Sequence, residues 1–223
     1  MMKKDAESLS GAEEFEEKKG KFITFEGTEG CGKTTQAEMI AEHLRLEGRE
    51  VVMVREPGGT AVGEKIREIL LDTRLGDIAP ITEALLFAAD RAQQIRDVVR
   101  PALQAKKIVV ADRYVDSSLA YQGVGRGCGL EAVKNLNEWA TGELEPDLTI
   151  MLDLPLEEGL KRAGELERDR IELESLEFHR NVRNAYDMLE RIHPRFVLVD
   201  ARGNPGAVHK RVLLEVNRVM QES

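Results

Sequence analysis

The chain has 223 residues, of which 42% are hydrophobic and 33% charged, the balance of a globular protein with one buried core. Its net charge of −9 argues against broad binding to a nucleic acid polymer or an anionic membrane, so a polyanionic substrate needs a local cluster of Arg and Lys. Two cysteines, Cys31 and Cys128, make neither a disulfide framework nor a zinc site, and a cytoplasmic protein is expected.

Residues 1–20 are predicted to be a solvated tail in front of one domain over residues 21–223. The tail has no apolar segment of the kind found in signal peptides, and its charged stretch over residues 13–19 favours contact with water. No apolar run in the chain approaches the length needed to span a membrane.

Five short apolar runs are predicted to be strands, over residues 21–25, 51–54, 108–111, 148–152 and 196–199. Helical spacing of apolar residues predicts helices over 34–46, 62–71, 81–103, 117–121, 156–162, 172–192 and 207–220, and another that ends at Trp139. The alternation predicts an α/β fold with three α/β/α layers around a five-stranded parallel sheet. Ligands of such a sheet bind at the carboxyl ends of its strands.

A phosphate-binding loop follows the first predicted strand. Residues 27–34 match G-x-x-x-x-G-K-[ST] between a strand and a helix, which indicates a P-loop NTPase-type fold. Its glycines let backbone N–H groups converge on phosphate oxygens, and the helix N-terminus adds a favourable dipole. We expect Lys33 to bridge the β- and γ-phosphates and Thr34 to hold Mg²⁺. The residues expected around ATP are Gly27, Thr28, Glu29, Gly30, Cys31, Gly32, Lys33, Thr34 and Thr35.

Two further segments carry side chains suited to a second nucleotide. Phe87 and Arg91 share a face of a predicted helix, where a ring can stack on a base and a guanidinium can bond its edge. Taken alone, they are equally compatible with a core aromatic and a solvated arginine. Asp112 ends the third strand, where a carboxylate can reach Mg²⁺, and Arg113 beside it can bridge two phosphates. A helix cap or an ion pair with Arg113 is the alternative for Asp112.

Four segments, in this order, resemble the bacterial thymidylate kinase family: FEGTEGCGKTTQ, REPGGT, LLFAADRAQ and DRYVDSSLAYQG. The likeness extends from about Lys21 to the C-terminus. It implies a dTMP kinase that transfers the γ-phosphoryl group of ATP directly and in line to dTMP, yielding dTDP for dTTP biosynthesis, with Mg²⁺ as cofactor. The family is homodimeric through long helices around residues 81–103, so a homodimer is expected.

The resemblance also implies how individual residues meet dTMP. The matching residues are Phe87 (stacked on thymine), Arg91 (its exocyclic oxygen), Ser118 and Gln122 (the base edge), Tyr121 and Glu29 (the sugar), Glu56 (sugar and phosphate), and Arg67 and Arg113 (the phosphate). The REPGGT segment also has the composition of a Pro-Gly turn that only shapes the loop after the second strand.

Residues 161–172 are predicted to form a short helical lid, although a solvated, salt-bridged connector has the same composition. Phosphoryl transfer needs added positive charge on the transferring group, and this phosphate loop carries no arginine. One branch of the family has its catalytic arginine in the loop, where this chain has Gly30, and another has it in the lid. Arg168 and Arg170 are therefore the lid candidates, beside Lys33 and Arg113 as the other catalytic residues.

Two other functions stay open on the sequence. A uridylate, cytidylate or guanylate kinase would share Lys33 and Thr34 but not the residues expected at the base. A regulator that uses ATP only as a ligand would show no dTMP-dependent turnover. A switch GTPase is not indicated, because the chain has no N-K-x-D guanine reader.

Overall fold

The computed structural model describes residues 20–164 and 169–221. The expected tail therefore lies outside the described residues except for Gly20, and so does Arg168. Five strands form one parallel sheet in the order β2-β3-β1-β4-β5. They are β1 (Phe22–Glu26), β2 (Val51–Arg55), β3 (Ile108–Asp112), β4 (Leu148–Asp153) and β5 (Phe196–Asp200). The fold class and all five predicted strands are confirmed.

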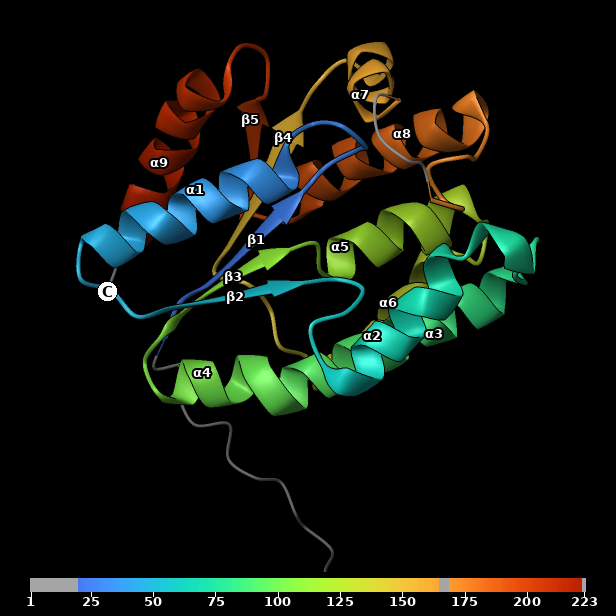
Figure 1. Cartoon of the computed structure of the whole chain (residues 1–223), viewed down its shortest axis with the longest axis horizontal. Helices are drawn as coiled ribbons and strands as arrows, with labels where there is room; N and C mark the ends of the chain where they lie inside the picture. Colours follow the sequence, from blue (N-terminus) through green and yellow to red (C-terminus); the bar gives the residue numbers. More distant parts are fainter. Residues whose placement is uncertain (1–19, 165–168, 222–223) are drawn as a thin grey trace, which may run out of the picture.

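Helices cover both faces of the sheet, which gives the three expected layers (Figure 1). On one face, α1 (Lys33–Leu46) and α9 (Pro205–Gln221) pack Ile40 and Val212 against β1 and β4 side chains such as Phe25 and Ile150. On the other face, α8 (Leu176–Ile192) contributes Val182 and Tyr186, and the π-helical turn η2 (Ile95–Val99) contributes Ile95 and Val99.

Most of the remaining helices gather beside the carboxyl ends of β2 and β3; the exceptions are the short helix that leads into the amino end of β3 and the helix that follows β4 (Figure 1). The remaining helices are α2 (Ala61–Leu71), η1 (Thr73–Leu75), α3 (Pro80–Gln94), α4 (Arg100–Gln104), α5 (Val115–Ser118), η3 (Leu119–Gly125), α6 (Leu130–Thr141) and α7 (Leu156–Ala163). Within the described residues, none of the helices is both long enough and apolar enough to cross a membrane.

Three predicted helix boundaries differ from the structure. The helix expected over 81–103 is divided into α3, η2 and α4 by a π-helical turn. The short helix expected over 117–121 continues as the π-helical η3 to Gly125. The helix expected from residue 172 begins at Leu176, because the Ser175 hydroxyl caps it by accepting the Phe178 N–H.

The site lies where the chain reverses its direction of travel across the sheet. From the central strand β1 the chain moves to β2 and β3 on one side, and it later returns to β4 and β5 on the other. The loop that leaves β1 therefore lies at a topological switch point, where parallel sheets bind their ligands.

Candidate active site

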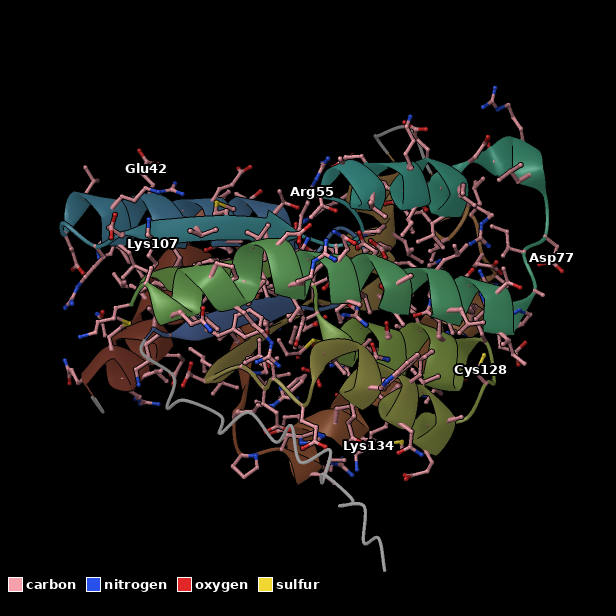
Figure 2. All side chains as sticks on the ribbon, turned by 90° about the horizontal axis from the view of Figure 1, so that it is seen from below. Glu42, Arg55, Asp77, Lys107, Cys128 and Lys134 are labelled. Carbon is pink, nitrogen blue, oxygen red and sulfur yellow. The ribbon has the colours of Figure 1, made fainter. Side chains whose placement is uncertain are left out.

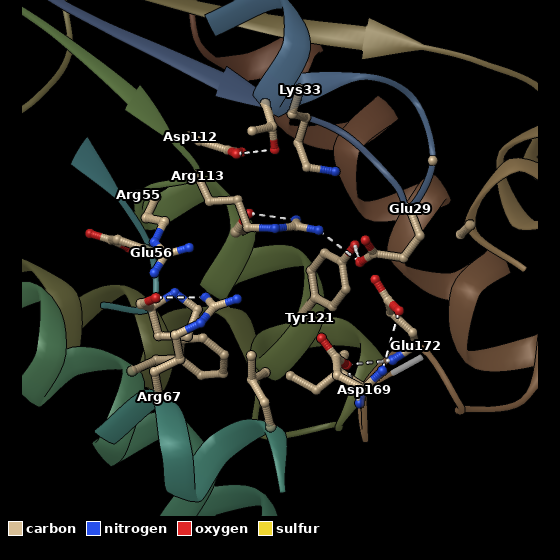
Figure 3. Close-up of a pocket in the computed structure, with 18 of the residues that line it drawn as sticks. Glu29, Lys33, Arg55, Glu56, Arg67, Asp112, Arg113, Tyr121, Asp169 and Glu172 are labelled. Carbon is tan, nitrogen blue, oxygen red and sulfur yellow. Dashed lines mark hydrogen bonds and ion pairs between the residues drawn. The ribbon is translucent and has the colours of Figure 1, made fainter. Parts of the chain in front are cut away.

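A pocket of about 490 Å³ opens at the carboxyl ends of β1, β2 and β3 (Figure 3). The structure brings most of the predicted site residues together in its lining: Glu29, Gly30, Gly32, Lys33, Thr34, Thr35, Glu56, Arg67, Phe87, Arg91, Asp112, Arg113, Ser118, Tyr121 and Gln122. Segments that lie far apart in the sequence thus meet around a single space. Gly27, Thr28, Cys31 and Arg170 are not part of this lining.

The phosphate loop is closed around its own lysine. Lys33 Nζ donates to the carbonyl oxygens of Gly27, at 3.1 Å, and Thr28, at 2.8 Å. Gly32, at φ 95°, turns the chain into α1 in a conformation that glycine adopts without steric cost. The Cys31 thiol is buried beneath the loop, and burial raises its pKa. A raised pKa disfavours the reactive thiolate, so Cys31 acts as a small packing residue.

The loop also packs directly against α7. A Cβ atom added to Gly30 would lie 2.0 Å from the Gly159 carbonyl oxygen, and one added to Gly159 would lie 2.4 Å from the Glu29 carbonyl oxygen. Two glycines thus allow the backbones of the loop and of α7 to touch. The same contact explains why no arginine can extend from position 30 in this chain.

Thr34 and Asp112 form a pair of oxygen ligands at the mouth of the loop. The Thr34 hydroxyl donates to Asp112 Oδ2 at 2.5 Å, and both side chains line the pocket. A hydroxyl and one carboxylate are suitable for Mg²⁺, which takes its other ligands from phosphates and water. Elsewhere in the described residues, no group of three or more His, Cys, Asp or Glu side chains is arranged to hold a metal.

Arg113 projects into the centre of the pocket from a strained position. Its φ is +76°, in the left-handed region that non-glycine residues rarely adopt. Its guanidinium pairs with Glu29 at 2.7 Å and donates to Ser117 Oγ at 3.1 Å (Figure 3). Burial alone would raise the pKa of Glu29, but the charges of Arg113 and Lys33 outweigh it and lower the pKa to about 2. Glu29 is therefore a permanent hydrogen-bond acceptor, and the Tyr121 hydroxyl donates to it at 2.7 Å.

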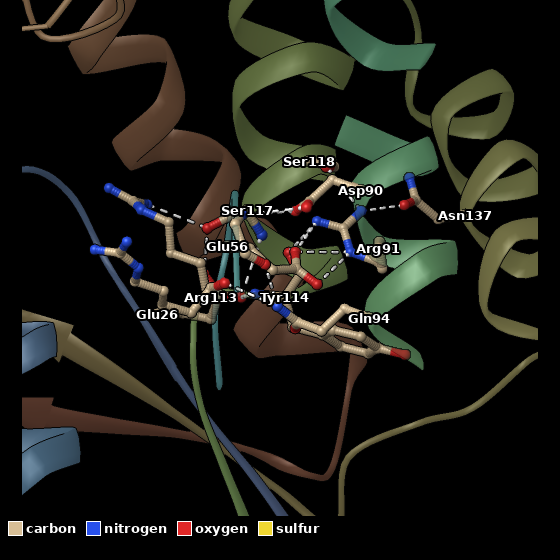
Figure 4. A network of polar contacts seen from close by, with 12 residues as sticks. Glu26, Glu56, Asp90, Arg91, Gln94, Arg113, Tyr114, Ser117, Ser118 and Asn137 are labelled. Carbon is tan, nitrogen blue, oxygen red and sulfur yellow. Dashed lines mark hydrogen bonds and ion pairs between the residues drawn. The ribbon is translucent and has the colours of Figure 1, made fainter. Parts of the chain in front are cut away.

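A buried carboxylate that the sequence analysis missed, Glu26, supports this strained turn from below (Figure 4). It accepts the Tyr114 N–H at 2.8 Å, the Ser117 hydroxyl at 2.6 Å and the Tyr186 hydroxyl at 2.9 Å. Burial raises the pKa of Glu26 to about 7, and Asp116 adds to the rise. Its position at the end of the first strand was visible in the sequence, but its partners are more than 85 residues away.

Arg91 is buried and is not a solvated arginine (Figure 4). It forms an ion pair with Glu56, to which Nε donates at 2.9 Å, and it also donates to Ser118 Oγ at 3.0 Å, the Tyr114 carbonyl oxygen at 3.1 Å and Asn137 Oδ1. All five of its N–H groups have acceptors, so a bond to a ligand must be shared with one of these acceptors. Asn137 had no signal in the sequence.

The loop after β2 is fastened to α3. Asp90 accepts the Gly58 N–H at 3.1 Å, and Gln94 donates to the carbonyl oxygens of Arg55, at 2.9 Å, and Gly58, at 2.8 Å. The REPGGT and LLFAADRAQ segments are therefore held together by hydrogen bonds. The REPGGT segment does turn the chain, but it also brings Glu56 into the pocket.

Two arginines face the open side of the pocket from this region. Arg67 of α2 donates to the Pro57 carbonyl oxygen at 2.8 Å, and burial together with the nearby charge of Arg55 lowers its pKa. Arg55, at the end of β2, lines the same pocket and remains more than half exposed (Figure 2). Two neighbouring cations with few anionic partners favour an anionic ligand. Arg55 lies within the REPGGT segment but was not expected to contribute to the site.

The segment around the predicted lid is divided between two environments. Arg170 is buried, where it pairs with Glu83 and donates to the Leu70 carbonyl oxygen at 3.0 Å instead of lining the pocket. Asp169, Ile171 and Glu172 do line the pocket, as does Arg162 of α7. Arg168, the second arginine expected to act from the lid, lies outside the described residues.

Comparison with known proteins gives a consistent result. The family described as thymidylate kinase matches residues 25–212. The thymidylate kinase of Caldanaerobacter subterraneus subsp. tengcongensis is 49% identical over 204 residues, which cover 91% of this chain and 98% of that protein. The thymidylate kinase of Synechococcus sp. strain JA-2-3B'a(2-13) is 51% identical over 193 residues, which cover 86% of this chain and 91% of that protein. The crystal structure of thymidylate kinase from Ehrlichia chaffeensis aligns with a TM-score of 0.74 at 30% identity, covering 88% of this chain and 98% of that chain.

Proposed function

This chain belongs to the thymidylate kinase family, and from that premise we propose that its pocket holds dTMP and the phosphate end of ATP face to face. The reaction is the ATP-dependent phosphorylation of dTMP to dTDP. The observation that carries the site assignment is the convergence of the phosphate loop, Phe87, Arg113 and Gln122 around one space.

The ATP phosphates lie along the phosphate loop. Lys33 Nζ, now bonded to two loop carbonyl oxygens, turns to the β- and γ-phosphate oxygens when they enter. Thr34 and Asp112 would hold Mg²⁺, which supplies charge neutralisation for the phosphate oxygens.

The dTMP base lies against Phe87, with Ser118 and Gln122 at its edge and Tyr121 beside the sugar. Glu29, kept ionised by Arg113, accepts the 3′-hydroxyl of the deoxyribose. Arg91 and Glu56 hold each other and Ser118, so they fix the shape of the base site as well as touching the ligand.

The acceptor phosphate lies among Arg55, Arg67 and Arg113, which all line the pocket next to Asp112. Its oxygens are already anionic, so transfer needs no general base and no covalent protein intermediate. Catalysis therefore consists of in-line positioning and of neutralising charge on the transferring group. Arg168 and Arg170 are proposed to supply further positive charge, and Arg170 would have to leave Glu83 to do so.

The test is ADP release in a coupled assay with dTMP, dUMP, CMP and GMP as acceptors and Mg²⁺ present. The expected result is the highest kcat/KM with dTMP. A preference for CMP or GMP would contradict the proposed base site, and turnover independent of any acceptor would contradict transfer itself. The same panel with Arg168→Ala and Arg170→Ala identifies the lid arginine, whose loss should lower kcat on the order of 10³-fold.

A further inference from the structure

A carboxylate behind the base site, Glu83 of α3, joins three parts of the chain. It is fully buried and accepts Gln122 Nε2 at 2.9 Å and Arg126 Nε at 3.0 Å, and it forms an ion pair with Arg170. Gln122 lies in η3, Arg126 directly follows η3, and Arg170 precedes α8. None of these partners would have been expected from the sequence.

The two guanidinium groups keep Glu83 ionised. Burial works against the charged form, but hydrogen bonds from Arg126, Gln122 and Arg170 outweigh it and lower the pKa of Glu83. An ionised carboxylate only accepts hydrogen bonds and has no hydrogen to donate. The group that faces it must therefore be a donor.

This requirement fixes the orientation of the Gln122 amide. Its two ends differ in hydrogen bonding, because the NH₂ group only donates and the carbonyl oxygen only accepts. With one N–H of Nε2 bound to Glu83, the carbonyl oxygen Oε1 is the acceptor that the amide has left for a ligand. Gln122 is 1% exposed and lines the pocket, and its side chain forms one hydrogen bond among the described residues, the one from Nε2 to Glu83.

We propose that Glu83 is a positioning residue that sets base specificity, because it holds Gln122 with its acceptor oxygen toward the base and so selects a pyrimidine that carries an N3–H donor. Thymine has this hydrogen, whereas N3 of cytosine is an acceptor. A cytosine at the same place would set two acceptors against each other in a buried site, an arrangement that such sites reject strongly. This inference rests on the proposed function, in which Gln122 lies at the base edge.

Glu83→Gln tests the proposal, with Glu174→Gln as the matched control. A glutamine at position 83 has the same shape but can donate as well as accept, so it no longer dictates how Gln122 is oriented. Glu174 pairs with Nη1 of Arg126, whereas the hydrogen bond of Gln122 goes to Glu83. The measurement is kcat/KM for dTMP and for dCMP, with the KM for ATP measured in parallel. We expect the dTMP-to-dCMP ratio to fall at least about 10-fold in Glu83→Gln, mainly through the KM for dTMP, and to stay within about twofold in Glu174→Gln.

An equal loss for both nucleotides in Glu83→Gln, with the ratio unchanged, would show that Glu83 only holds the fold together and would overturn the proposal.

Wild-type enzyme with N3-methylated dTMP provides a second test that does not depend on the folding of a variant. This analogue lacks the N3 hydrogen and should be a substrate at least about 10-fold poorer than dTMP, and efficient phosphorylation of it would also overturn the proposal. Failure of the wild type to phosphorylate dTMP would instead refute the proposed function.

Discussion

At the scale of single residues, the proposed base site includes one aromatic face. Phe87 is half-buried and lines the pocket, and its ring is the surface on which thymine is proposed to stack. Stacking of a base on an aromatic side chain contributes about 1–3 kcal/mol, so Phe87→Ala should raise the KM for dTMP by roughly 5- to 150-fold. The KM for ATP should stay within about twofold, and Phe87→Tyr, which keeps the ring, should behave like the wild type. Steady-state kinetics decide, and an unchanged KM for dTMP in Phe87→Ala would place the base elsewhere.

The protonation state of one buried residue, Glu26, affects the stability of the whole chain. Its pKa is raised from the ordinary 4.5 to about 7 in the folded state, chiefly by burial. A carboxyl group with a raised pKa favours the folded state while it is protonated. This contribution is fully present below about pH 4.5 and is lost as the pH rises through 7.

The neutral variant Glu26→Gln should therefore respond differently to pH. From pH 5 to pH 8, the free energy of unfolding of the wild type should fall relative to that of the variant, because only the wild type must ionise a buried group. Urea denaturation across this range measures the difference. Parallel pH profiles for the two proteins would show that Glu26 titrates normally. Because Glu26 also supports the strained turn at Arg113, the variant should in addition have a higher KM for dTMP.

At the scale of elements, the contact between the phosphate loop and α7 sets a steric limit. Gly→Ala inside a helix normally stabilises it by about 1 kcal/mol. At Gly159 the added methyl group would lie 2.4 Å from the Glu29 carbonyl oxygen, so the loop must move. Displacing the phosphates by about 1 Å costs on the order of 100-fold in rate, and we expect kcat/KM to fall by about that factor in Gly159→Ala.

Gly206→Ala in α9 is the control for this substitution. Its Cβ atom would meet only Asn204 Oδ1 at 3.5 Å, an ordinary contact. This variant should keep full activity and gain up to about 1 kcal/mol of stability, measured by thermal unfolding. Full activity in Gly159→Ala would mean that α7 moves away from the loop without affecting the site.

α3 organises the site through several of its faces at once. Phe87 and Arg91 reach the pocket, Asp90 and Gln94 hold the loop after β2, and Glu83 holds η3. One helix thus contributes to the proposed base site and holds both the loop after β2 and the helical turn that carries Gln122. These contacts of α3 help to bring the four segments recognised in the sequence together at a single pocket.

At the scale of the whole molecule, local signals in the sequence predicted the fold better than the site. Apolar runs and helical spacing located all five strands, because buried parallel strands carry continuous apolar sequence. The residues that line the pocket were also largely predicted, but their partners were not. Asn137 lies 46 residues from Arg91, and Glu83 lies 87 residues from Arg170, so neither pairing leaves a local pattern. Arg170 was expected to act from the lid, and only the structure shows that it is bound to Glu83.

The last prediction concerns assembly into a homodimer, which we propose from family membership and from one feature of the surface. Ile81 and Leu85 lie one turn apart on α3 and are 69% and 51% exposed, and Ala89 continues the stripe. An apolar stripe along a helix is normally covered, and a second copy of the chain would cover it here.

The wild type should therefore have the mass of a dimer in light scattering at about 10 μM, a concentration that exceeds the Kd of a stable interface. Leu85→Glu should shift the mass toward the monomer, because a carboxylate would be buried without a partner. Leu214→Glu, at a 64% exposed site on α9 across the sheet from α3, should leave the mass unchanged (Figure 1). A monomeric wild type, or a Leu85→Glu variant that stays dimeric, would exclude this face as the interface.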